Sequence, residues 1–409
     1  MNFPFLFKKE ILDNLYNFRY GIILALSVLV IGTSIFTMYR DYCSRVENYL
    51  VLRPEGKEAT AIIPPTPLSV FVKGLDENLC RSYEIDFLGI SMGSSQQAVN
   101  RLFKLFTTPD LLYIIKIVLS LCAILMAYDM ITREKENGTL KLILSNPVKR
   151  PALLFAKWLG GFTSFIVPIL IVCLFSIAVV SLLPMVQFTW ADYGKIGTFI
   201  LTSILYLGIF FTLGLFISCL TARSVTSLIL SLFFWTMIVF VVPNLGNSLS
   251  KQIIKTKSIE QLQFQQNMAW RKAVFNKVNN KSEGKMDFGW EQLTMAFQIE
   301  QNKQIKISET IAKCSPSGIF TLVASNIMGT GIDDQNRLKN HVWEYYNTVK
   351  DAPSDSDGNL TGDFPVFSYQ RTKLTEVLSQ NITSYAILLF FIALLFTGAY
   401  AFFMKYDLR

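Results

Sequence analysis

The 409-residue sequence contains a single histidine, His341. Zinc hydrolases with a His-Glu-x-x-His motif need two histidines on one helix face, so this chemistry is excluded. The sequence also lacks the pattern Gly-x-x-x-x-Gly-Lys-Ser/Thr, with which a P-loop binds the phosphates of a nucleotide. The chain therefore supplies neither kind of site, and we expect no metal and no cofactor in it.

Charged residues are scarce over long stretches of the chain. Stretches of about 20 predominantly apolar residues are typical of transmembrane helices. Six such stretches predict spans at roughly 20–39, 110–129, 160–184, 197–221, 225–246 and 382–404. The net charge of +8 is then best explained by the loops of a membrane protein, because no nucleic-acid-binding motif accompanies it.

Lys and Arg gather in the segments that six spans would place on one side of the membrane. These segments are the amino end, the loop 130–158, the short loop 222–224 and the carboxyl end. The only short loop on the other side, 185–195, carries Lys195 alone. Because cytoplasmic loops carry an excess of basic residues, both termini are predicted to lie in the cytosol, in a multi-pass protein of the cytoplasmic (inner) membrane.

These patterns predict an all-α polytopic membrane protein. Residues 1–19 are expected to form a cytosolic interfacial helix, because apolar side chains from Ile11 to Phe18 recur on one side. A simple extension of the first span is the alternative. Residues 20–246 would hold spans one to five with the outer loop 40–108, and residues 382–409 the sixth span and a cytosolic tail. The fold of the loop 40–108 is not indicated by its sequence.

Residues 247–381 are predicted to form a mainly helical extracytoplasmic domain. Apolar residues recur at helical spacing on both sides of a polar stretch at 279–287, which predicts a helical hairpin. Pro316 and Gly318 would end this hairpin. A further helix is expected at 333–349, with Asp333 or Asp334 as its cap.

Cysteines and small residues give weaker indications. Cys122, Cys173 and Cys219 fall within spans, where they would pack as small apolar side chains. Cys43, Cys80 and Cys314 fall in the outer loops, and whether Cys43 and Cys80 form a disulfide stays open.

Two features lie inside the predicted spans. Gly214, Ser218 and Ala222 are spaced by four on the fourth span, which predicts close helix packing within the chain or against a second subunit. Lys116 is a charge within the second span, and it either reaches the outer surface or lines a polar path.

The loop 130–158 has the clearest local pattern. Asn137-Gly138 should end the helix that extends the second span, and Thr139 could cap a new short helix. Leu140, Ile143 and Leu144 would cluster on one side of this short helix, and Asn146-Pro147 would end it. A short helix with an apolar side and a charged frame could be gripped by a partner protein.

The run Arg133-Glu-x-Glu-x-Gly-Thr-Leu140, followed by Pro147-Val-x-Arg150, resembles the loop between the second and third spans of ABC-2-type transporter permeases. The six-span layout and the amino-terminal helix resemble this family too. The resemblance implies that the loop binds a separate ABC ATPase subunit, which would hold the ATP and Mg, and that a second, identical or related permease completes the transporter. Carried over by position, the contact candidates are Glu134, Glu136, Gly138, Thr139, Leu140, Leu144, Pro147 and Arg150.

The large outer loop before the last span resembles a bacterial branch of these permeases that includes the gliding-motility and nitrous-oxide-reductase-maturation types. The resemblance implies no catalysis in this chain. It implies coupling of ATP hydrolysis in the partner to substrate export, or to conformational work on an extracytoplasmic protein. The residues alone leave one alternative open, a membrane anchor or assembly protein with an outer interaction domain and no ATPase.

Overall fold

The computed structural model describes residues 3–52, 60–76, 83–86, 89–92, 109–145, 149–280, 290–349, 364–365 and 367–406. The chain divides into two compact units. The first unit contains Met1–Trp235 together with Phe320–Arg409, and the second contains Thr236–Ile319.

Six helical stretches are long and apolar enough to cross a membrane, which confirms the six predicted spans and the all-α polytopic fold. They are Phe18–Val51, Leu111–Glu136, Arg150–Ser181, Trp190–Leu220, Ser224–Ile253 and Ile382–Met404. Most extend beyond the predicted apolar windows, because a helix continues through polar residues until its backbone is capped or broken.

Single regular helices form four of the spans. The first, third, fourth and sixth spans are α2 (Phe18–Leu52), α9 (Arg150–Ser181), α10 (Trp190–Leu220) and α18 (Ile382–Met404). Pro168 lies inside α9, which continues through it.

The second and fifth spans each contain a wider, π-helical segment. The second consists of α5 (Leu111–Tyr113), the π-helix η2 (Ile114–Leu119), α6 (Ser120–Ala127) and α7 (Thr132–Glu136). The fifth consists of α11 (Ser224–Thr236), the π-helix η3 (Met237–Val241) and α12 (Val242–Ile253).

The amino-terminal segment is a helix separate from the first span. α1 (Phe3–Leu15) ends before a break at Tyr16 and Asn17, and α2 begins at Phe18. α1 packs on α9 where Gly160 permits a close approach, since a Cβ at Gly160 would lie 2.8 Å from the Cβ of Glu10. Leu12, Leu15, Tyr16 and Phe18 stay exposed.

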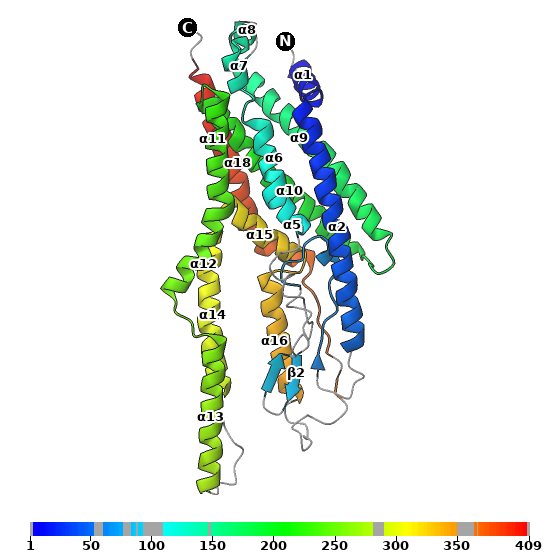
Figure 1. Cartoon of the computed structure of the whole chain (residues 1–409), viewed down its shortest axis with the longest axis vertical. Coiled ribbons are helices and arrows are strands. Elements are labelled where there is room, and N and C mark those ends of the chain that lie inside the picture. Colours follow the sequence, from blue (N-terminus) through cyan, green and yellow to red (C-terminus); the bar gives the residue numbers. More distant parts are fainter. Residues whose placement is uncertain are drawn as a thin grey trace. The chain divides into compact units, whose positions relative to one another are not determined.

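The end of the first unit away from the two chain termini has its own small core (Figure 1). A three-stranded antiparallel sheet of β1 (Thr60–Ala61), β2 (Tyr83–Asp86) and β3 (Gly89–Met92) comes from the loop 40–108. The side chains of Ala61, Ile63 and Tyr83 pack on α16 (Ile332–Val349), together with Phe364, Phe367 and Tyr369. The segment between the first and second spans and the segment before the last span therefore share one core.

Shorter elements complete this unit. They are the 3-10 helix η1 (Pro67–Val70) and the helices α15 (Pro316–Ile327) and α17 (Leu374–Gln380). α15 begins in the second unit and continues into the first.

The second unit contains the predicted hairpin. α13 (Ile259–Asn280) and α14 (Trp290–Ala312) form its two arms, and α14 packs along α12. A Cβ at Gly246 would lie 2.7 Å from the carbonyl oxygen of Ser308, so glycine permits this contact between α12 and α14. The predicted single domain over 247–381 is thus divided, since α16 packs with the first outer loop in the other unit.

Several sequence-based expectations need correction. Asp333 and Asp334 lie inside the first turn of α16 instead of capping it; Asp333 accepts from Asn326 and Asp334 from Thr372. Lys195 lies in α10, where it is buried, and not in a loop. Ala222 lies beyond the end of α10 and is exposed, so it does not extend the small-residue face of that helix.

The other small residues and the cysteines are placed as follows. Gly214 and Ser218 face the second span within the chain: a Cβ at Gly214 would lie 2.9 Å from the Cβ of Ala127, and the Ser218 hydroxyl accepts from the backbone N–H of Ile131 at 3.0 Å. Cys43 has no disulfide with any described cysteine. Cys80 lies outside the described residues, as does most of the predicted hairpin turn.

Candidate functional site

The loop between the second and third spans folds into two short helices with a sharp break between them. α7 ends at Glu136 and α8 (Thr139–Ser145) begins after Gly138, whose φ of 69° lies in the left-handed region that glycine adopts without strain. The predicted break is therefore confirmed. Within the first unit, α7 and α8 lie at the same end as α1 and the last turn of α18, and α16 lies at the opposite end (Figure 1).

One side of α8 belongs to the core of the protein. Leu140 is 0% exposed and packs in a cluster that draws on α1, α9, α10 and α18. The other buried residues of this cluster are Leu6, Ile131, Leu153, Leu154, Ala156, Leu215, Cys219, Ala399 and Phe403. Ile143 and Leu144 are half-buried against this cluster. The predicted apolar side of the short helix is thus used within the chain.

A buried ion-pair triad links the loop to the amino-terminal helix. Lys157, on α9, is 3% exposed, and its Nζ lies 2.8 Å from Oε1 of Glu10 and 2.7 Å from Oε1 of Glu134. Glu10 comes from α1 and Glu134 from α7, so one ammonium group joins three helices. Charge-assisted hydrogen bonds of this length are about twice as strong as neutral ones, which fixes the three elements relative to one another.

Lys135 ties the loop to the fourth span. Its Nζ donates to the carbonyl oxygens at the end of α10, at 3.3 Å to Ser218, 2.6 Å to Cys219 and 2.8 Å to Thr221. The last carbonyls of a helix have no partner within the helix and carry partial negative charge, so a cation there is favourable. The same ammonium lies 5.6 Å from the ring centroid of Tyr406, beyond the last span.

Glu136 and Arg150 act on two further helix ends. The carboxylate of Glu136 accepts from the backbone N–H of Ser224 at 2.9 Å and from its hydroxyl, at the start of α11. An anion is favourable there because the first N–H groups of a helix are unpaired. Arg150 Nη1 donates to the carbonyls of Met404 and Tyr406, at 3.0 and 3.2 Å, at the end of α18.

The first span is held at the same end of the bundle. Arg19 Nη1 lies 2.6 Å from Oδ2 of Asp129, just before the loop, and its guanidinium lies over the ring of Tyr128. Together with Lys135, Glu136, Arg150 and the Lys157 triad, this pair connects the segment 129–157 to the ends of all the other spans. The segment is therefore a mechanical hub at one end of the bundle.

The contact candidates divide into internal and outward groups. Glu134, Glu136, Leu140 and Arg150 bond or pack within the chain, whereas Gly138 and Thr139 are exposed and Leu144 is half-buried. The predicted cap is not seen at Thr139, whose hydroxyl donates to the carbonyl of Glu134 at 3.4 Å. Pro147 lies outside the described residues.

Leu142 is a candidate that the sequence reasoning missed. Its side chain is 69% exposed, on the side of α8 away from the buried Leu140. Leu142 follows Leu140 by two positions, which is about 200° around a helix. The only sign of it in the sequence was an apolar residue that does not lie on the apolar side of this helix. An exposed leucine on a short, rigidly held helix is a surface that another protein could bind.

No cluster of three or more His, Cys, Asp or Glu side chains that could hold a metal occurs in the described part of the chain. His341 lies on the exposed side of α16, 3.2 Å from Glu344. The geometry of the 129–157 segment suits binding and transmission of force.

Comparison with known proteins agrees with this geometry. The family model described as "ABC-2 family transporter protein" matches residues 5–408, nearly the whole chain. No curated protein matches the chain.

Proposed function

Because the chain belongs to the ABC-2 family of transporter proteins, we propose that it is the membrane-spanning permease subunit of an ATP-driven transporter. A separate ABC ATPase subunit would bind ATP and Mg and hydrolyse the nucleotide. The permease would convert the movement of that subunit into a rearrangement of its spans. The single observation that carries the proposal is the hub formed by residues 129–157.

The hub suits the transmission of force because it is stiff and widely connected. Lys135, Glu136 and Arg150 each bond the end of a different span, so these ends cannot move independently of the loop. The Lys157 triad and the apolar cluster around Leu140 add α1 and α9. A push on α8 would therefore reach the whole bundle, as an ATP-driven transporter requires.

The outward side of α8 is the proposed binding surface for the ATPase. Gly138, Thr139 and Leu142 are exposed there, and the buried Leu140 holds the helix from behind. Leu142 would enter a groove of the partner, and the remaining exposed polar residues would surround it. Among the candidates carried over by family resemblance, the internal ones position this surface and do not themselves touch the partner.

The experiment compares two leucines of the same short helix. Leu142→Asp should abolish co-purification of the ABC ATPase in mild detergent while leaving the yield and the thermal unfolding midpoint of the permease unchanged. Leu140→Asp should lower the unfolding midpoint of the permease itself, because it buries a carboxylate in the apolar cluster. Asn347→Asp, an exposed change on α16 at the opposite end of the first unit, is the control for added charge.

An unchanged ATPase yield from Leu142→Asp would refute the α8 surface. A folded permease from which no ATPase is ever recovered would instead support the alternative of a membrane anchor with an outer interaction domain.

The remaining parts of the transporter follow from this role. We propose that both termini and the hub lie in the cytosol, at the cytoplasmic membrane, and that a second permease, identical or related, completes the assembly. The core of α16 and the sheet would then lie outside, where it could bind an extracytoplasmic protein. ATP hydrolysis would drive export of a substrate or conformational work on such a protein.

A further inference from the structure

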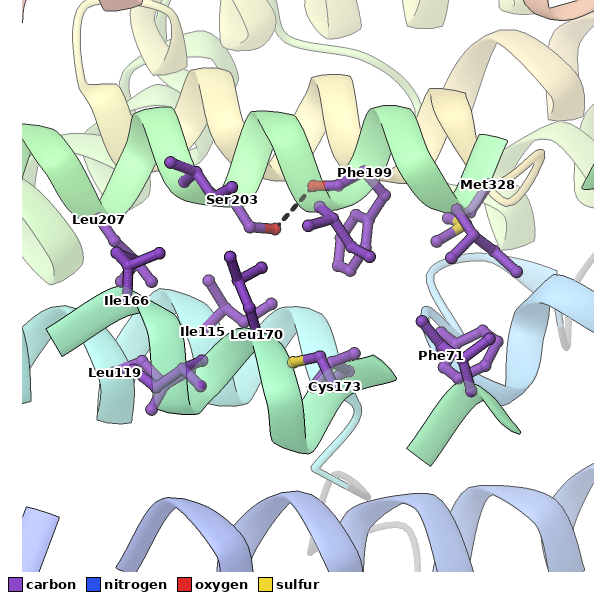
Figure 2. Close-up of a pocket in the computed structure, with 16 residues that line it drawn as sticks. Phe71, Ile115, Leu119, Ile166, Leu170, Cys173, Phe199, Ser203, Leu207 and Met328 are labelled. Carbon is purple, nitrogen blue, oxygen red and sulfur yellow. Dashed lines mark hydrogen bonds between the residues drawn. The ribbon is translucent and has the colours of Figure 1, made fainter. Parts of the chain in front are cut away.

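An elongated apolar slot runs between the second, third and fourth spans, within the first unit (Figure 2). It encloses about 490 Å³ of space between protein atoms, part of which is open to the surroundings. Ile166 on α9 and Leu207 on α10 line one end, and Ile177 and Ile196 on the same two helices line the other. The slot therefore lies parallel to the spans.

The slot has the length and the lining of a site for one hydrocarbon chain. From Ile196 to Leu207, α10 rises about 16 Å at roughly 1.5 Å per residue. The lining consists of apolar side chains apart from Ser203 and Cys173, and the Ser203 hydroxyl is already bonded to the carbonyl of Phe199 at 2.8 Å (Figure 2). No polar lining group is left to orient a polar ligand, so the occupant should be apolar along this length.

A buried cation stands beside one end of the slot, on the residue before the lining residue Ile196, although it does not itself line the slot. Lys195, 6% exposed, stands on α10 one turn before Phe199, so the two side chains share a helix face with Ser203. Its ammonium group makes no hydrogen bond or ion pair with any described residue. Asp334 and Asp192 lie within electrostatic range, as does the like-charged Arg371, but neither carboxylate reaches it. A buried cation of this kind calls for an anion.

The position of Lys195 matches the depth of a lipid head group. Trp190 and Tyr193, in the first turns of α10, are 92% and 42% exposed. Exposed aromatic residues at the end of a span mark the interface between hydrocarbon and water. Lys195 follows directly after them, and the slot continues from there toward the membrane centre.

We propose that the slot binds an anionic lipid, with one hydrocarbon chain between α9 and α10 and the anionic head group at Lys195. The chain end would lie near Ile166 and Leu207, and Phe71 and Met328 would close the slot near the head group. This binding goes beyond the proposed function and does not depend on the ATPase, so it can be measured on the permease alone.

The test uses the full chain in nanodiscs of phosphatidylcholine. The discs contain a trace of a photoreactive lipid with a diazirine at the end of one chain, bearing either a phosphatidylglycerol or a phosphatidylcholine head. Mass spectrometry then locates the labelled residues. We expect the anionic probe to label the region of Ile166 and Leu207 preferentially. Lys195→Gln should reduce this labelling roughly tenfold, which corresponds to about 1.4 kcal/mol, and Lys195→Arg should retain it.

Two further variants separate the site from general lipid contact. Ser203→Leu fills the middle of the slot and should abolish labelling at its far end. Lys116→Gln removes a lysine of the second span that follows the lining residue Ile115, and it should leave the labelling unchanged. Labelling only at the lipid-facing Ile171 and Phe175, or equal labelling by both head groups, would overturn the proposal.

The competing role of Lys195 is to balance the charge of Asp334 within the fold. In that case Lys195→Gln would lower the thermal unfolding midpoint, the addition of Asp334→Asn would restore it, and the head-group preference would persist throughout. That combination also contradicts the proposal. If the double variant Lys195→Gln/Asp334→Asn unfolds at the wild-type temperature but no longer prefers the anionic head group, the lipid proposal is supported.

Discussion

Lys157 is the residue that joins the amino-terminal helix to the loop hub. Its ammonium is surrounded by protein, so its transfer from water is costly and must be offset by the carboxylates of Glu10 and Glu134. Oε2 of Glu134 is also buried and has no hydrogen-bond partner in the part of the chain that the structure describes. The triad therefore depends on all three charges being present together.

Replacement of Lys157 by methionine should destabilise the protein by about 3–5 kcal/mol, because it leaves two carboxylates close together without a cation. The thermal unfolding midpoint in detergent measures this effect. A triple variant that adds Glu10→Gln and Glu134→Gln should recover much of the loss, since no buried charge remains. If Lys157→Met unfolds at the wild-type temperature, the triad does not hold α1 and α7 in place.

Asp334 provides a prediction about pH. Burial raises the pKa of this carboxyl group above its usual range, although the Thr372 hydroxyl and nearby cations oppose the shift. A carboxyl group with a raised pKa in the folded state favours folding when protonated, and this contribution is lost as the pH rises through the folded-state pKa. Above the ordinary pKa of aspartate, burial of this carboxyl group therefore disfavours the folded state.

Asp334→Asn should raise the unfolding midpoint at pH 7, and the gain should shrink as the pH falls toward the ordinary pKa of aspartate. Asparagine can still accept from Thr372, so the hydrogen bond at 3.1 Å is kept. Glu344→Gln, an exposed change on the same helix, is the control and should shift the midpoint little at any pH. A variant that is less stable than wild type at pH 7 would show that Asp334 is held in its charged form.

At the scale of elements, the break between α7 and α8 sets the direction in which α8 points. A Cβ at Gly138 would meet no atom within 4 Å, so the constraint there is the backbone and not space. Gly138→Val should cost about 1–2 kcal/mol, the penalty for an L-residue in the left-handed region. It should also weaken co-purification of the ATPase, because α8 would turn to relieve this strain.

Gly138→Asn should be tolerated, because asparagine adopts the left-handed conformation more readily. Gly197→Ala is the matched control, since Gly197 also has open space around it but lies within α10. It should be neutral or slightly stabilising. Equal behaviour of the valine and asparagine variants at position 138 would show that the left-handed turn is not required.

Helices with a long apolar stretch, and helix ends marked by a helix-breaking pair of residues, could be predicted from the sequence. Long apolar windows gave the six spans, and Asn137-Gly138 gave the break before α8. The sequence could not indicate which side of α8 faces inward, because Leu140 is buried partly by residues far away in the chain, such as Leu6 and Phe403. The pairing of α16 with the first outer loop depends on equally distant contacts, so neither helical period nor composition predicts it.

Charged residues of the loop were the hardest to interpret from sequence. Glu136 and Arg150 have the residue types expected at a protein interface, and both are used on helix ends within the chain. A sequence shows which side chains carry charge, but not which helix end they reach after folding. The same holds for Lys195, whose predicted loop is the first turns of α10 and whose ammonium is buried.

At the scale of the whole molecule, the distribution of basic residues and the hub make one joint prediction about orientation. In cells or sealed vesicles, a membrane-impermeant maleimide should reach a cysteine at Glu344 from the extracytoplasmic side and a cysteine at Ser145 only from the cytoplasmic side. Both positions are exposed within the first unit. Cys43, Cys80 and Cys314 would first be replaced by serine, whereas the buried Cys122, Cys173 and Cys219 can remain.

Labelling of both positions from one side would refute the six-span topology. Reversed labelling would keep the six spans but place α8 outside, where no ATPase could bind, so it would contradict the permease role while sparing the fold.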